Sequence, residues 1–260
     1  MKRVSKYCLC LFSILIVTLS QQLHVHANPV EQNGLINSPI EAKLSNLISA
    51  ENIVPYLAYF KKDETVSWQV TLPANHEAQS PQGLLVYISP QDSGGIYEMW
   101  KPLLIEKNLI WISADKGGND FTAQRRVLQA LLAVQLAAKN YKLDKQRIYV
   151  TGFSGGGRVT SMIAPLYPEA FTGSIFMGGA NYWGSRLPEK FSLMRNKSYV
   201  FINGENDFNL KESKKVSEKF KQAGLSNVEF FEVPGLGHMP PDTKWLGAAI
   251  DYLDTHKPNN

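Results

Sequence analysis

The sequence predicts an α/β fold, in which a single domain contains a mostly parallel, twisted sheet of about eight strands with helices on both faces. Strand-like and helix-like segments alternate from Gly83 to the C-terminus, and this order favours right-handed crossovers between parallel strands. The strand-like segments are continuous apolar runs, such as Leu84 to Ile88, which are typical of strands buried on both faces. With 260 residues, the chain is long enough to bury one substantial core.

The first 27 residues have the pattern of a secretory signal peptide. Three basic residues precede a mostly apolar run from Leu9 to Leu19, and Val25-His26-Ala27 resembles a cleavage site. We therefore expect cleavage near Ala27 and a secreted or periplasmic mature chain that begins at Asn28. The apolar run is short for a transmembrane helix, and a retained anchor is the alternative.

Removal of this segment lowers the net charge of the chain. The whole chain carries +4, and residues 1–27 hold three of the 27 basic residues and none of the 23 acidic ones, which leaves +1. The mature chain shows no basic patch, so we expect no nucleic-acid partner and no stable association with a membrane. Both cysteines, Cys8 and Cys10, lie in the signal segment, which excludes a thiol nucleophile and a thiolate metal site from the mature protein.

Residues 28–53 are polar and predict an N-terminal leader along the surface, with one short helix from Ile40 to Ser49. The main domain is expected from residue 54 to residue 260. It begins with an antiparallel hairpin of Tyr56 to Phe60 and Val66 to Leu72, because a charged run separates these two apolar segments. The strands and helices that follow are expected, in chain order, at Leu84–Ile88, Tyr97–Glu106, Leu109–Ser113, Thr122–Asn140, Arg147–Thr151, Gly155–Tyr167, Gly173–Met177, Tyr199–Asn203, Lys211–Ala223, Val228–Val233 and Lys244–Leu253.

One pentapeptide, Gly152-Phe153-Ser154-Gly155-Gly156, fits the pattern G-x-S-x-G and lies between a predicted strand and a predicted helix. A serine hydroxyl must stand clear of the fold to be reached by a base, and a tight turn with small flanking residues achieves this. We therefore interpret Ser154 as a nucleophile. The alternative is a glycine-rich turn with a bystander serine; a phosphate-binding loop is disfavoured because Arg158 and Val159 replace its Lys and Ser or Thr.

A base and an acid are expected after later strands of the same sheet, because ligands bind at the carboxyl ends of parallel strands. His238 follows the last predicted strand and is interpreted as the general base. Asp207 follows Tyr199–Asn203 and is interpreted as the acid that orients the imidazole. Asp207 has the alternative role of an Asx turn before the next helix, where Asn209 is another candidate cap. Glu205 is the runner-up acid, and Asp242 is too close to His238 in sequence to be preferred.

Backbone donors for an oxyanion are expected at two places. The N–H of Gly155 follows the nucleophile, and the second donor is expected in the loop from Ser89 to Gly95, with Gln91 preferred over Asp92. Asn181, Tyr182 and Trp183 follow a strand at the same edge and are candidates for the substrate pocket, or for a cover over the core. The segment from Gly178 to Asn196 is short for a lid, so we expect a minimal lid and an open site.

The chain resembles the α/β-hydrolase superfamily over roughly residues 54–255. The motifs around Ser154, Asp207 and His238, together with Gly178-Gly179-Ala180-Asn181-Tyr182-Trp183, are most similar to its secreted esterase branch, which includes polyhydroxybutyrate depolymerase-like, feruloyl esterase-like and dienelactone hydrolase-like enzymes. The resemblance implies Ser154 as nucleophile, Asp207 as acid and His238 as base, in the chain order of that superfamily. The chain departs from many relatives at Ser89-Pro90, where they carry His-Gly, and it lacks their paired cysteines.

The sequence therefore predicts a secreted serine hydrolase that cleaves a small or polymeric carboxylic ester through an acyl-enzyme on Ser154. No cofactor or metal is expected, since three scattered histidines and no cysteine remain after signal removal. The alternatives are a serine peptidase of the prolyl-oligopeptidase type and an inert binding protein with the same fold.

Overall fold

A computed structural model describes residues 30–49, 53–76 and 81–258 of the chain. Its helices and strands, in chain order, are β1 (Val30–Gln32), β2 (Leu35–Asn37), β3 (Ile40–Lys43), α1 (Leu44–Leu47), η2 (Val54–Ala58), β4 (Thr65–Pro73), β5 (Gln82–Ile88), η3 (Glu98–Trp100), α2 (Lys101–Glu106), β6 (Leu109–Ala114), α3 (Ala123–Asn140), β7 (Leu143–Phe153), α4 (Gly155–Leu166), β8 (Gly173–Met177), α5 (Phe191–Met194), β9 (Ser198–Gly204), α6 (Leu210–Gln222), β10 (Val228–Val233) and α7 (Thr243–Thr255). The signal segment predicted for residues 1–27 lies outside the described residues. Within the described ranges, no helix is long and apolar enough to cross a membrane.

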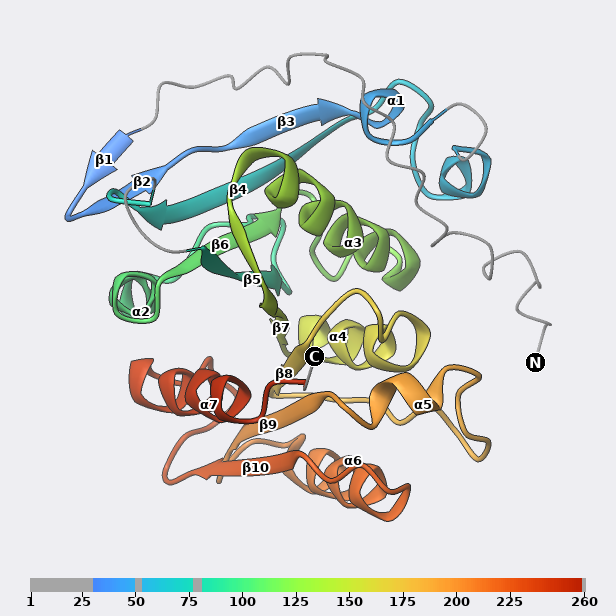
Figure 1. Cartoon of the computed structure of the whole chain (residues 1–260). Helices are drawn as coiled ribbons and strands as arrows, with labels where there is room; N and C mark the ends of the chain where they lie inside the picture. The colour runs from blue at the N-terminus through green and yellow to red at the C-terminus, as the bar shows by residue number, and fades with distance from the viewer. Residues whose placement is uncertain (1–29, 50–52, 77–80, 259–260) are drawn as a thin grey trace.

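The strands of the described residues form one ten-stranded sheet in the order β1-β2-β4-β6-β5-β7-β8-β9-β10, with β3 also paired to β4 (Figure 1). The six strands from β6 to β10 along this order pair parallel with one another. The remaining four strands pair antiparallel at one side. The mostly parallel α/β sheet predicted from the sequence is thus confirmed.

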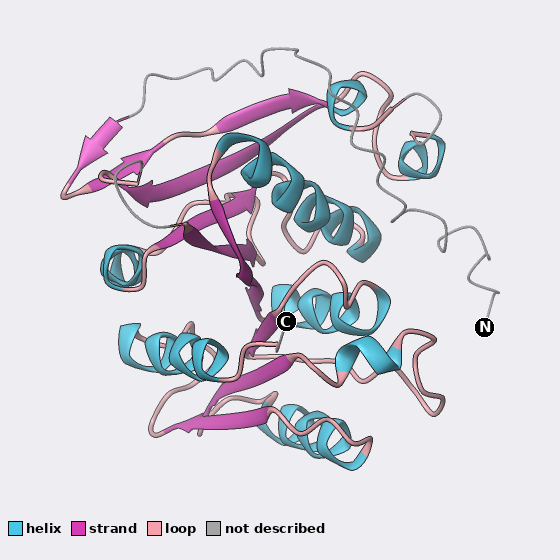
Figure 2. Cartoon of the chain, in the orientation of Figure 1, coloured by secondary structure: helices cyan, strands magenta, loops and turns pink. Residues whose placement is uncertain are grey.

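Helices cover both faces of this sheet, with α3, α4 and α6 on one face and α2 and α7 on the other (Figure 2). The strand β5 shows why its sequence is apolar throughout: all seven of its residues are buried. Val86 faces the core under α3, whereas the adjacent Leu85 faces the core under α2 and α7. Burying a side chain of this size stabilises the fold by about 1.5–3 kcal/mol, so both faces of each central strand require apolar residues.

The N-terminal part of the described chain differs from expectation. Residues 28–53 were expected to form a surface leader with a helix over 40–49, but Ile40–Lys43 is a strand and only Leu44–Leu47 is helical. Ile40 and Ala42 are buried while the residues between and after them are exposed, which is the period of a strand on a sheet. With β1, β2 and β3 contributed by this region, the sheet has ten strands rather than about eight.

The hairpin predicted for Tyr56–Phe60 and Val66–Leu72 is wrong. The first segment forms the 3-10 helix η2, which has a proline in its first turn, a position that suits the fixed φ of proline. The second segment forms β4, which pairs with β3, β2 and β6 instead. The predicted helix Tyr97–Glu106 likewise begins with a short 3-10 turn before α2.

Candidate active site

Ser154 occupies a strained turn between β7 and α4. Its φ of +55° and ψ of −119° are rare for a residue with a side chain. The flanking glycines explain how the chain turns so tightly: a Cβ on Gly156 would lie 1.8 Å from the carbonyl oxygen of Ile88, and one on Gly152 would lie 2.5 Å from the carbonyl carbon of Gly156. The turn therefore requires glycine at both positions and holds Ser154 at the end of the strand.

His238 lies within hydrogen-bonding distance of both Ser154 and Asp207, from which it is separated by 84 and 31 residues. The distance from His238 Nε2 to Ser154 Oγ is 2.8 Å, and that from His238 Nδ1 to Asp207 Oδ1 is 3.0 Å. An ionised carboxylate only accepts hydrogen bonds, so Nδ1 donates to Asp207 and Nε2 is left to accept from the serine hydroxyl. Ser154, His238 and Asp207, predicted from three separate segments, are brought together at the carboxyl ends of β7, β10 and β9.

Asp207 is buried and held by further hydrogen bonds. Its side chain is 1% exposed. Besides His238, it accepts from the backbone N–H of Asn209 at 2.8 Å and from Nδ2 of Asn203 at 3.3 Å. The Asx turn expected as an alternative role is therefore present together with the contact to His238. Asn209 instead donates to the carbonyl of Gly178 at 2.8 Å and makes no side-chain cap on α6.

The two other carboxylates considered for this role have different partners. Glu205 accepts from the backbone N–H of Gly235 at 2.8 Å and thereby links the loop after β9 to the loop that carries His238. Asp242 caps α7 by accepting from the N–H of Trp245 at 3.2 Å. Both therefore have structural roles next to the site.

Two aromatic rings enclose the imidazole of His238. The ring of Phe153 lies 4.9 Å from it between centroids, and the ring of Phe208 lies 4.3 Å from it. Phe208 is 77% exposed, so one face of this ring is open to solvent beside the histidine. The sequence analysis did not single out Phe208, although its position directly after Asp207 was a usable signal.

The predicted oxyanion donors have different surroundings. Gly155 is the first residue of α4, where backbone N–H groups lack partners within the helix. The N–H of Gln91 donates to the hydroxyl of Ser89 at 3.0 Å, so in this conformation it is already used. A Cβ on Gly155 would lie 2.1 Å from Oδ1 of Asn119, which places the Asn119 side chain against the turn.

The loop after β5 is fastened to the loop after β6 by three hydrogen bonds. The N–H of Asn119 donates to the backbone carbonyl of Pro90 at 3.0 Å, and the N–H of Lys116 donates to the backbone carbonyl of Asp92 at 2.6 Å. The N–H of Gly94 donates to the side-chain Oδ1 of Asp115 at 2.9 Å. The other oxygen of Asp115 accepts from two side chains of β4, Gln69 at 2.7 Å and Ser67 at 3.1 Å. The loop expected to supply the second oxyanion donor is therefore held at several points.

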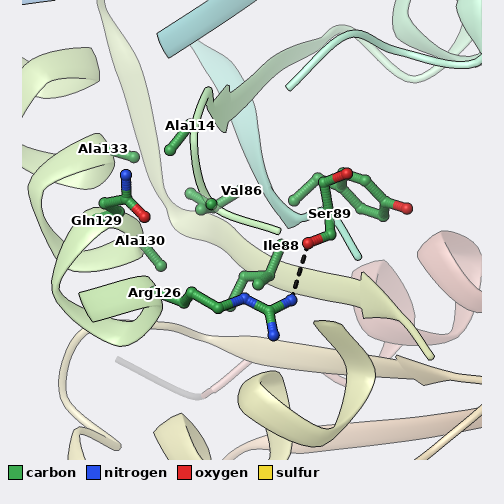
Figure 3. A pocket seen from close by; sticks show the side chains of 10 residues that line it. Val86, Ile88, Ser89, Ala114, Arg126, Gln129, Ala130 and Ala133 are labelled. Atoms are coloured by element: carbon green, nitrogen blue, oxygen red, sulfur yellow. Dashed lines mark hydrogen bonds between the residues drawn. The ribbon is translucent and has the colours of Figure 1, made fainter. Parts of the chain in front are cut away.

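Arg126, which the sequence analysis did not single out, lies behind this loop. Its Nη2 donates to the carbonyl of Ser89 at 2.8 Å (Figure 3), and its Nη1 donates to Oδ1 of Asn119 at 3.2 Å. Arg126 also lines a cavity of about 10 Å³ together with Gln129, between α3 and β5 (Figure 3). Such a volume is close to the minimum that holds one water molecule.

The three candidate pocket residues are engaged in the structure. Asn181 accepts from Nη1 of Arg158 at 2.9 Å. Tyr182 and Trp183 stack on each other with centroids 4.3 Å apart, and Trp183 lies 4.7 Å from the ring of Phe220 in the core. These contacts favour the alternative in which the two aromatic residues cover the core.

No group of three or more potential metal ligands among His, Cys, Asp and Glu is found in the part of the chain that the structure describes. His76 packs against the ring of Tyr141, and Nδ1 of His256 lies 2.9 Å from the carbonyl of Tyr252.

Known proteins with similar sequence or structure support this description. A family model for phospholipases and carboxylesterases matches residues 108–257, which include Ser154, Asp207 and His238. Poly(3-hydroxyalkanoate) depolymerase C from Paucimonas lemoignei is 40% identical over 43 residues, which are 16% of this chain and 10% of that protein. The matched segment thus spans only about a tenth of this curated relative.

Solved structures with the same fold cover most of the chain. The feruloyl esterase module from Clostridium thermocellum, a mutant in complex with sinapinate, superposes with a TM-score of 0.60 at 14% identity over 86% of this chain and 90% of that chain. S-formylglutathione hydrolase from Staphylococcus aureus superposes with a TM-score of 0.58 at 12% identity over 85% of this chain and 95% of that chain. The sheet order, the strained serine turn and the family match agree, and the chain belongs to the phospholipase/carboxylesterase family of α/β-hydrolases.

Proposed function

We propose that this protein is an exported serine hydrolase that cleaves carboxylic esters through an acyl-enzyme on Ser154. The observation that supports this most strongly is the hydrogen-bonded series from Ser154 through His238 to the buried carboxylate of Asp207. Membership of the family supports ester hydrolysis as the reaction. Export is inferred from the signal pattern of residues 1–27.

In the first step, Ser154 Oγ attacks the acyl carbonyl carbon while Nε2 of His238 takes the hydroxyl proton. Asp207 holds the ring with Nδ1–H toward the carboxylate and stabilises the imidazolium that forms. The carbonyl oxygen becomes an oxyanion, which the N–H of Gly155 and a donor from the loop after β5 stabilise. Gln91 serves as that donor if its N–H leaves the hydroxyl of Ser89.

In the second step, His238 gives its proton to the leaving alcohol, and the ester C–O bond breaks. Water then enters where the alcohol was, loses a proton to His238 and attacks the acyl-enzyme. Collapse of this second tetrahedral intermediate releases the carboxylic acid and returns the proton to Ser154. Apart from the ester and this water, the proposed cycle uses only groups of the chain itself.

The proposal is tested by turnover of paired ester and amide substrates. The purified protein is given p-nitrophenyl esters of increasing acyl length and the corresponding p-nitroanilides, including aminoacyl p-nitroanilides. We expect hydrolysis of the esters, with kcat/KM for each ester well above that for its amide. Preferential cleavage of aminoacyl amides would instead identify a peptidase, and a protein inert toward all substrates would contradict the proposed function.

A further inference from the structure

Arg126 is a buried cation whose hydrogen-bond acceptors are all neutral. It is 5% exposed. Its guanidinium donates to the carbonyl of Ser89 at 2.8 Å and to the amide oxygen of Asn119 at 3.2 Å, and its Nη1 lies 3.5 Å from the carbonyl of Gly155. In the described part of the chain, no carboxylate forms an ion pair with Arg126.

The neighbouring arginine on the same helix shows the usual arrangement. Arg125 is 7% exposed and donates from both terminal nitrogens to the carboxylate of Glu64, at 2.6 and 3.3 Å. Its charge is therefore compensated. Arg125 and Arg126 are buried to a similar extent, but among the described residues only Arg125 is paired with a carboxylate. Arg125 is therefore a matched control for a substitution at Arg126.

Burial of an uncompensated cation opposes folding. Burial lowers the pKa of Arg126 to about 10, so the group is still charged at neutral pH but its charge is disfavoured. Its Nε and the side-chain oxygen of Gln129, both at the small cavity of Figure 3, have no hydrogen-bond partner in the structure. Stability alone therefore does not explain an arginine at this position.

The three acceptors of Arg126 belong to three different segments around Ser154. Ser89 begins the loop after β5, Asn119 lies in the loop after β6, and Gly155 follows the candidate nucleophile. Ile88, which precedes Ser89, pairs in register with Gly152, so the loop begins level with the serine turn. The two groups expected to bind the oxyanion, Gly155 N–H and a donor of the loop, thus belong to segments that meet at one guanidinium.

We propose that Arg126 is a positioning residue for acyl transfer, which fixes the loop from Ser89 to Gly95 relative to Gly155 and places a positive charge behind the oxyanion donors. The inference rests on the proposed function. Negative charge develops on the acyl oxygen only as the tetrahedral intermediate forms, and a site of low dielectric strengthens its interaction with fixed charges. Arg126 therefore stabilises the transition state more than the bound substrate.

This role has a distinct kinetic signature. Loss of Arg126 lowers kcat with little change in KM, because ground-state binding does not involve the oxyanion. A trifluoromethyl ketone inhibitor forms an adduct with serine that carries the same oxyanion. Loss of Arg126 therefore raises the Ki of this inhibitor by the same factor by which it lowers kcat/KM. The pH profile of kcat/KM keeps its shape, since the hydrogen bonds between His238 and its two partners are not altered.

The test compares Arg126→Lys and Arg126→Met with Arg125→Lys and Asn119→Ala. For each protein, kcat and KM on p-nitrophenyl acetate, the pH profile and the Ki of the trifluoromethyl ketone are measured, and circular dichroism reports folding. Displacement of catalytic groups costs up to about 100-fold in rate. We expect Arg126→Met to lower kcat by about 10- to 100-fold, Arg126→Lys to lie between Arg126→Met and wild type, and Arg125→Lys to stay within about twofold of wild type.

Each outcome bears on a separate claim. The inference is overturned if both Arg126 variants keep wild-type kcat, if the loss is in KM, or if Arg125→Lys lowers kcat equally. If neither Arg126 variant folds, the Asn119→Ala variant decides, because the exposed Asn119 can be shortened without disturbing the core. A lower kcat of Asn119→Ala at constant KM supports the inference, and unchanged kinetics overturn it. A wild-type protein that is inactive on every ester would overturn the proposed function, and the inference with it.

Discussion

The Nδ1 atom of His238 lies 3.0 Å from Oδ1 of Asp207, although 31 residues separate them. The neighbouring carboxylate of Glu205 binds the N–H of Gly235 instead. A histidine base needs a carboxylate on Nδ1 to keep the correct tautomer and to stabilise its charged form. The two acids are close in sequence, but their different partners predict different effects on the proposed reaction.

We predict that Asp207→Asn lowers kcat by about 10³- to 10⁴-fold, because an amide favours the wrong tautomer of His238. Glu205→Gln is the matched control and should lower kcat less than about tenfold, since its amide oxygen still accepts from Gly235. Steady-state turnover of p-nitrophenyl acetate by both variants checks this. The reverse order of the two effects would reassign the acid to Glu205.

The serine turn requires glycine at position 156, where a Cβ would lie 1.8 Å from the carbonyl oxygen of Ile88. We predict that Gly156→Ala lowers the free energy of unfolding by more than about 3 kcal/mol or prevents folding, because backbone atoms must move. At Gly95, the nearest atom to an added Cβ, apart from its chain neighbours, is the hydroxyl of Ser93 at 3.4 Å, so Gly95→Ala should change the free energy of unfolding by less than about 0.5 kcal/mol. Urea unfolding curves measure both, and equal stability of the two variants would contradict the tight turn.

A pH-dependent contribution to stability is expected from Glu64. The hydrogen bond from Arg125 holds the pKa of the Glu64 carboxyl below its usual value. A carboxylate with a lowered folded-state pKa stabilises the fold at pH values above its unfolded pKa, and this stabilisation is lost as the pH falls through the folded-state pKa. Glu64→Gln should therefore lower the free energy of unfolding by about 2 kcal/mol at pH 7. The difference from wild type should become progressively smaller below about pH 4.

Thermal unfolding of wild type and Glu64→Gln between pH 7 and pH 3 measures this difference. Glu41→Gln, an exposed carboxylate on β3, serves as the control and should leave the melting temperature nearly unchanged at each pH. A difference for Glu64→Gln that stays constant with pH would show that its carboxylate charge is not involved.

The exposed ring of Phe208 bears on substrate choice. In the proposed reaction His238 protonates the leaving alcohol, so we expect the alcohol portion of the ester on the His238 side of Ser154, where the ring of Phe208 lies 4.3 Å from the imidazole between centroids. We predict that Phe208→Ala lowers kcat/KM up to about tenfold for esters of aromatic alcohols and less for methyl esters, because the ring contact is lost. Acetate esters of benzyl alcohol and methanol test this, with Leu187→Ala, another exposed apolar residue, as the control. An equal loss on both esters would mean that Phe208 acts only through His238.

The proposed export and signal cleavage can be checked on the expressed protein. We predict an N-terminus at Asn28, because Val25-His26-Ala27 has small residues at the positions that a signal peptidase reads. N-terminal sequencing of protein recovered outside the cytoplasm measures this. Recovery of the uncleaved chain in the membrane fraction would support the retained anchor instead.

The candidate site could be predicted from sequence because each of its residues lies at the end of a strand or in the loop that follows one. Ser154, Asp207 and His238 needed only the strand pattern and the rule that such residues meet at one edge of a parallel sheet. Arg126 could not be found in this way, because it lies near the start of α3 beside a second arginine, Arg125, and its acceptors are two backbone carbonyls and an amide. Every residue has a backbone carbonyl, so the sequence does not reveal which carbonyls accept a hydrogen bond from a side chain.

The N-terminal strands were missed for a related reason. Ile40–Lys43 is only four residues long, and a pattern so short fits a helix as well as a strand. Its conformation is decided by pairing with β4, from which it is separated along the chain by α1 and η2. The central strands were predicted correctly because burial on both faces gives them long apolar runs.

The most direct test of the account is covalent labelling of the nucleophile with a fluorophosphonate. Wild type, Ser154→Ala and Ser226→Ala, which alters an exposed serine, are incubated with the probe, digested and mapped by mass spectrometry, and their turnover of p-nitrophenyl acetate is measured in parallel. The account predicts an adduct on Ser154 in wild type and in Ser226→Ala, no adduct in Ser154→Ala, and a loss of turnover of at least about 10³-fold in that variant. An adduct on another residue, or a Ser154→Ala protein that still hydrolyses esters at the wild-type rate, would contradict it.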